Sequence, residues 1–81
     1  MSSEIDEVKR LLAETCAIDR ATIKDEGRLI EYGLDSVRAM DFIISLEEAF
    51  GISIPDDAAA KLRTVADVGA FVAGRRAAGA T

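Results

Sequence analysis

The chain has 81 residues, 49% of them hydrophobic, which fits one small domain (residues 1–81). Its 10 basic and 15 acidic side chains give a net charge of −5, which disfavours nucleic acid as a partner. With no His and with Cys16 as the only cysteine, it lacks Ser-His and Cys-His nucleophile pairs and the usual zinc ligand sets, so we expect neither catalysis nor a metal site. No apolar run is long enough to span a bilayer and the N-terminus is polar and acidic, so we expect no membrane contact and a cytoplasmic location.

The first predicted helix begins after Ser3, which we expect to act as its N-cap, and places acidic residues in its first turn. Its apolar stripe ends at Cys16, which we interpret as a buried small hydrophobe. Residues 18–35 then lose the helical period and predict a long loop. We expect this loop to be anchored by four side chains: Ile23, Leu29, Ile30 and Tyr32.

Residues 36–50, SVRAMDFIISLEEAF, give the strongest helix signal, and Gly51 follows as a suitable C-terminal cap. After the extended link ISIP, a short helix is predicted from Asp56.

The last predicted helix opens at Thr64, which forms a capping-box pattern with Asp67, and residues 77–81 are expected to be a frayed tail. The sequence therefore predicts an all-α bundle with three main helices, one short helix and a long first loop.

The helix over residues 36–50 carries two apolar faces at 3.6 residues per turn. One should face the core and consists of Ala39, Phe42, Ile43, Leu46 and Phe50. The other consists of Val37, Met40 and Ile44, lying among the carboxylates of Asp41 and Glu48. This second face either tucks against the long loop or docks partner proteins, for which an apolar centre surrounded by carboxylates is suited.

Asp35 and Ser36 stand at the start of this helix, where unpaired backbone N–H groups and the helix dipole favour negative charge. One interpretation is that Ser36 is a simple N-cap. The other is that its oxygen carries a phosphodiester, which the same helix terminus would stabilise.

The segment YGLDSVRAMDFIISLEEAFGISIPDD resembles the acyl carrier proteins. Residues 33–37, GLDSV, are close to the family's G-x-D-S-L signature, and residues 46–57, LEEAFGISIPDD, resemble its link between the second and third helices. The resemblance extends over nearly the whole chain.

This resemblance implies a four-helix carrier without catalytic activity. Ser36, next to Asp35, would receive 4′-phosphopantetheine from coenzyme A through a phosphopantetheinyl transferase. The thiol of this arm would carry acyl intermediates as thioesters between enzymes of fatty acid, polyketide or related secondary-metabolite synthesis. The partners implied are acyl-loading enzymes, ketosynthases and other acyl-transferring enzymes with basic docking patches, meeting a monomeric carrier.

The family also shelters acyl chains between helices, and four residues are placed to line such a cleft: Leu46, Ile54, Ala59 and Leu62. An ordinary core is the alternative interpretation of these four, and both can hold.

The chain departs from the family pattern at two positions. Val37 stands where Leu is more usual, and Arg38 stands where carriers of bacterial fatty acid synthesis usually have an acid. Arg38 either selects different partners or forms a solvated pair within the helix. GLDSVR also resembles the aryl carrier domains of siderophore synthesis. An aryl or aminoacyl carrier of a nonribosomal pathway and an unmodified helical adaptor therefore remain alternatives.

Overall fold

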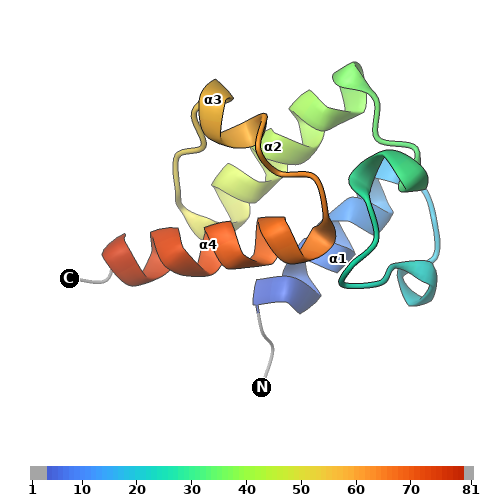
Figure 1. Cartoon of the computed structure of the whole chain (residues 1–81), viewed down its shortest axis with the longest axis horizontal. Coiled ribbons are helices and arrows are strands. Elements are labelled where there is room, and N and C mark those ends of the chain that lie inside the picture. The colour runs from blue at the N-terminus through green and yellow to red at the C-terminus, as the bar shows by residue number, and fades with distance from the viewer. Residues whose placement is uncertain (1–3, 80–81) are drawn as a thin grey trace.

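The computed structural model describes residues 4–79, which form an all-α bundle. In Figure 1, α4 crosses the lower part of the molecule, α2 runs above it, and α3 is a short turn beside α2. The elements are α1 (Glu4–Cys16), η1 (Arg20–Thr22), η2 (Leu29–Tyr32), α2 (Ser36–Phe50), α3 (Asp56–Ala59) and α4 (Val65–Gly79). The predicted fold class, with three main helices, one short helix and a long first loop, is confirmed.

Helix α1 supplies one wall of the core and packs against both α2 and α4. Its expected N-cap, Ser3, lies outside the described residues. Cys16 is 8% exposed, as predicted, and burial raises the pKa of its thiol. A thiol in this environment is largely protonated at neutral pH and behaves as a hydrophobic side chain. The buried residues of α1 are Val8, Leu11, Leu12, Ala13 and Cys16.

The loop between α1 and α2 contains two 3-10 turns that the sequence pattern did not predict, η1 and η2. Ile23 and Leu29 are buried and anchor it as expected, but Ile30 is 72% exposed, so its predicted role as an anchor is wrong. Consecutive residues of a 3-10 turn point in different directions, which is why Leu29 enters the core and Ile30 does not. Tyr32 closes the loop because its hydroxyl oxygen accepts the backbone N–H of Lys24 at 2.9 Å.

Helix α2 buries the face that the pattern predicted, centred on Phe42 (1% exposed) and Leu46 (0%). Phe50 is only partly buried, and the Arg76 guanidinium lies 5.6 Å from the centre of its ring. Gly51 ends the helix in the left-handed region, with φ of 64°, where a residue without Cβ is favoured.

The link after α2 is tied back to that helix. The Glu47 carboxylate accepts the backbone N–H of Ile54 at 2.8 Å, and Ile54 is buried at 5% exposure. This hydrogen bond fixes the position from which α3 begins.

Helix α4 begins with the predicted capping box. The Asp67 carboxylate accepts the N–H of Thr64 at 3.1 Å, and the Thr64 hydroxyl accepts the N–H of Asp67 at 3.1 Å. Its core residues Val65, Val68 and Val72 are fully buried. The helix extends to Gly79, so residues 77–79 of the expected frayed tail are helical, and residues 80–81 lie outside the described part of the chain.

An isolated bridge joins the long loop to the start of α4. It pairs Arg28 with Thr64, and the Leu29 N–H donates to the Arg63 carbonyl at 2.9 Å. Within residues 4–79 no helix has both the length and the apolar character needed to cross a bilayer.

Candidate functional site

Asp35, rather than Ser36, is the N-cap of α2. Its Oδ1 accepts the backbone N–H of Arg38 at 2.8 Å, and its carbonyl accepts the N–H of Ala39 at 2.7 Å. Ser36 is therefore the first helical residue, and the interpretation of Ser36 as a simple N-cap is wrong. Its side chain is exposed, and its hydroxyl forms no hydrogen bond with any residue that the structure describes.

This arrangement suits a negatively charged group on the Ser36 oxygen. The backbone N–H groups of Ser36 and Val37 have no acceptor among residues 4–79, as expected in the first turn of a helix. They lie at the positive end of the α2 dipole. A phosphodiester on Ser36 would therefore meet two free donors and a favourable field, so the residues present fit phosphopantetheine.

An open depression of about 640 Å³ lies beside Ser36, between η2, the start of α2 and the segment before α4. Asp35 and Ser36 border it on one side, and Arg28 and Arg63 also line it. The remaining lining is apolar: Leu29, Ile30, Leu34, Ala39 and Leu62. The attachment position thus opens onto an apolar surface flanked by charged groups.

A second hollow of about 100 Å³ continues from this depression toward the core. Ala59 and Leu62 line it, as the cleft prediction requires. Leu46 and Ile54 do not line either hollow, because at 0% and 5% exposure they belong to the closed core. The apolar residues shared by the depression and the second hollow are Leu29, Leu34, Ala39 and Leu62.

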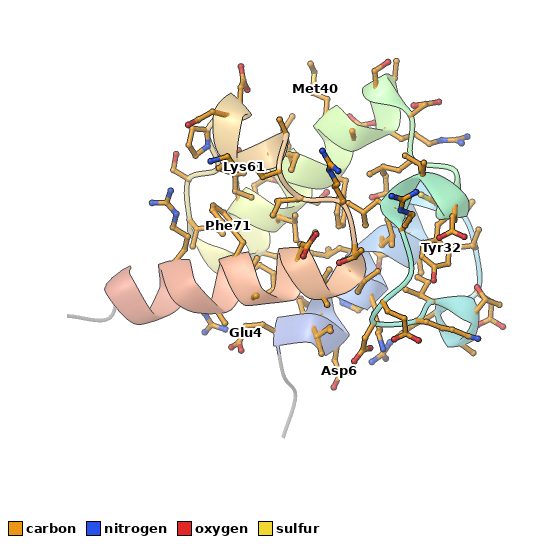
Figure 2. The ribbon with its side chains drawn as sticks, in the orientation of Figure 1. Glu4, Asp6, Tyr32, Met40, Lys61 and Phe71 are labelled. Carbon is orange, nitrogen blue, oxygen red and sulfur yellow. The ribbon has the colours of Figure 1, made fainter. Side chains whose placement is uncertain are left out.

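The second apolar face of α2 is open to solvent. Val37 is 73% exposed, Met40 67% and Ile44 47%, so these side chains do not tuck against the long loop. In Figure 2, Met40 stands on the side of α2 away from α1 and α4. Asp41 and Glu48, which flank this face, are also exposed. We call Val37, Met40 and Ile44 the exposed face of α2.

Arg38 forms no ion pair within the described part of the chain. Its Nη1 donates instead to the carbonyl of Gly33 at 3.4 Å, a long hydrogen bond. The paired interpretation of this residue therefore has no support in the geometry, and the guanidinium remains available at the edge of the exposed face of α2.

Sequence reasoning missed Arg28 and Arg63 as residues of the site. They are 35 positions apart in the chain, and backbone pairing around the bridge between Arg28 and Thr64 brings their segments together. No local pattern in the sequence signals such a pairing.

The comparisons with known proteins agree with this geometry. The family model described as "Phosphopantetheine attachment site" matches residues 6–72. An acyl carrier protein of Helicobacter hepaticus is 38% identical over 68 residues, which are 83% of this chain and 90% of that protein.

Two of the solved structures that share the fold are acyl carrier proteins. Hexanoyl acyl carrier protein from the actinorhodin polyketide synthase of Streptomyces coelicolor has a TM-score of 0.77 at 28% identity, covering 90% of each chain. An acyl carrier protein of Thermotoga maritima has a TM-score of 0.73 at 26% identity, covering 85% of this chain and 81% of that one. The chain therefore belongs to the acyl carrier protein family, whose members carry phosphopantetheine and act as carriers rather than as enzymes.

Proposed function

We propose that Ser36 is the residue that bears 4′-phosphopantetheine. The observation that supports this most is that the residue that caps α2 is not the residue that would bear the arm. Asp35 caps the helix, which leaves the Ser36 hydroxyl exposed and without a hydrogen bond to any described residue. In the transfer, the Ser36 oxygen forms a phosphodiester bond as the pyrophosphate bond of coenzyme A breaks, and adenosine 3′,5′-bisphosphate leaves.

The bound group supplies a thiol that holds acyl chains as thioesters. This protein's own residues supply the apolar shelter, and we assign that role to Ala59 and Leu62 of the predicted cleft, together with Leu29, Leu34 and Ala39. Leu46 and Ile54 lie in the buried core beneath these residues, and their proposed role is to support the lining of the cleft.

The exposed face of α2 is proposed to dock the partner enzymes. Its three apolar side chains give a contact area, and the neighbouring carboxylates of Asp41 and Glu48 attract basic patches on a transferase, an acyl-loading enzyme or a ketosynthase. Arg38 breaks the acidic pattern, and we propose that it repels enzymes whose docking patch is strongly basic.

The cargo is proposed to be an acyl chain of fatty acid or polyketide synthesis. The apolar lining of the second hollow supports this class. So does the structural likeness to an acyl carrier protein from the actinorhodin polyketide synthase, whose solved form bears a hexanoyl group as a non-natural intermediate. An aryl or aminoacyl cargo is the alternative. The cytoplasmic location and the monomeric state expected from the sequence stay predictions.

The decisive experiment is the intact mass after incubation with coenzyme A and a broad-specificity phosphopantetheinyl transferase. One phosphopantetheine should add to the wild type and to Ser53→Ala, which removes an exposed serine from the link after α2. Ser36→Ala should gain none. A mass increase in Ser36→Ala would refute the site, and no increase in the folded wild type would favour the unmodified adaptor.

A further inference from the structure

Two arginines from distant parts of the chain form one rim of the depression beside Ser36. Arg28 precedes η2, and Arg63 precedes α4. Two backbone hydrogen bonds join these segments. The Leu29 N–H donates to the Arg63 carbonyl at 2.9 Å, and the Val65 N–H donates to the Gly27 carbonyl at 3.0 Å. Both side chains therefore line the depression from a fixed backbone. We call them the arginine rim.

Within the region that the structure describes, neither guanidinium of the rim is held in an ion pair, although a carboxylate lies near each residue. Glu31 accepts the backbone N–H of Arg28, and Asp67 accepts that of Arg63, whose positive charge helps to lower the pKa of Asp67. Some of the other cations are paired: Arg10 contacts Glu7 and Glu14, and Arg76 contacts Glu4. The rim thus places two guanidinium groups that no ion pair holds next to the proposed attachment residue. A guanidinium binds phosphate oxygens through two parallel hydrogen bonds, which suits it to an oxyanion.

We propose that the arginine rim binds the phosphodiester of the arm on Ser36, and that the apolar floor of the depression holds the adjoining dimethyl segment of that arm. This inference rests on the proposed function of Ser36. It gives the arm a resting position on the protein, against η2 and the segment before α4, from which it leaves to reach an enzyme.

The phosphodiester is favoured over a charged cargo because of where it is tethered. Its phosphorus is bonded to the Ser36 oxygen, and Ser36 lines the same depression as the rim, so the effective concentration is high. A carboxylate on the cargo sits at the far end of a long arm and must fold back to reach the rim. Asp35 also lines the depression and repels the phosphate, so the two guanidinium groups offset a negative charge already present.

The test compares the apo protein with the protein fully loaded from coenzyme A, with loading verified by mass. In wild type, the side-chain Nε NMR signals of Arg28 and Arg63 should shift on loading, and the melting temperature should rise at low salt. In Arg28→Gln/Arg63→Gln the rise should be lost. The matched control, Lys24→Gln/Lys61→Gln, removes the same charge from residues that do not line the depression and should keep the rise.

Two outcomes would overturn the proposal. One is a loaded wild type whose two Nε signals do not move. The other appears when the arm is loaded from succinyl-coenzyme A and from butanoyl-coenzyme A: signals that move only with the succinyl group would make the cargo carboxylate the ligand. Because the mass is measured on every sample, failure of the rim is distinguishable from failure of Ser36 to accept the arm.

Discussion

The Asp35 carboxylate and the Arg38 backbone N–H are 2.8 Å apart, and this one hydrogen bond releases Ser36 from capping α2. Replacing each residue by Ala should therefore have unequal effects. Asp35→Ala should lower the free energy of unfolding by about 1 kcal/mol, the usual cost of a lost N-cap. Ser36→Ala should change it by less than about 0.5 kcal/mol, as for a surface position. Urea denaturation of both apo variants measures this, and equal losses would mean that the capping role is shared.

The centre of the core should be most sensitive at Phe42. Its ring is 1% exposed, so Phe42→Ala should cost about 3–5 kcal/mol and can unfold so small a domain. Phe50→Ala should cost clearly less, because Phe50 is only partly buried. Thermal melts of the two variants show which substitution lowers the stability more. A larger loss at Phe50 would place the core further along α2 than the structure does.

Met40 should matter for partners and little for folding. It is 67% exposed, so Met40→Ala should change the free energy of unfolding by less than about 1 kcal/mol. The same variant should be modified more slowly by the transferase if the exposed face of α2 docks it. Initial rates under subsaturating carrier, beside a melt of the same sample, separate the two effects. An unchanged rate would remove Met40 from the docking surface.

Arg38 should govern which enzymes accept the carrier. If its charge repels the enzymes of ordinary fatty acid synthesis, Arg38→Glu should be loaded faster by a housekeeping acyltransferase at low salt. The gain should fade at high salt, because the Debye length shrinks from about 10 Å at 0.1 M to about 3 Å at 1 M. Loading rates of both proteins at the two salt concentrations check this. Identical low-salt rates would leave Arg38 without a role in selection.

Acid should weaken the start of α4. The backbone N–H groups of Arg63 and Thr64 hydrogen-bond to the Asp67 carboxylate and lower its pKa below the ordinary value. The stability it contributes is fully present above the unfolded pKa of about 3.9 and is lost as the pH falls through the lower folded pKa. Stability against pH below about 4 should thus be flatter in Asp67→Asn than in wild type.

Glu26→Gln is the control for this comparison, because the Glu26 carboxylate forms no hydrogen bond or ion pair with the residues described. For Glu26→Gln, the dependence of stability on pH below about 4 should be as steep as in wild type. A slope in Asp67→Asn as steep as in wild type would assign the acid sensitivity to other carboxylates.

The sequence predicted what depends on local order. The period of α2 placed Phe42 and Leu46 on the core face and Met40 on a separate apolar face, and the Thr64–Asp67 pattern located the start of α4. Capping and amphipathic spacing act within a few residues, so a single chain displays them.

What the sequence could not show depends on tertiary contacts. The choice of Asp35 over Ser36 as N-cap needs the backbone angles at the helix start, since either residue type can cap. Leu46 and Ile54 were expected to line the acyl cleft, but apolar spacing cannot tell a closed core from a cavity wall. The exposure of Ile30 likewise follows from the turn that η2 makes.

The bridge between Arg28 and Thr64 also sets an order of events during folding. It encloses α2 and α3 completely, so it forms only after a long stretch of chain has been gathered, whereas α2 can form from neighbouring residues. A chain that ends at α3 lacks Leu62 and Arg63, so one side of the depression beside Ser36 is missing. The depression becomes complete only when the segment before α4 arrives, so its presence distinguishes a finished carrier from an unfinished one.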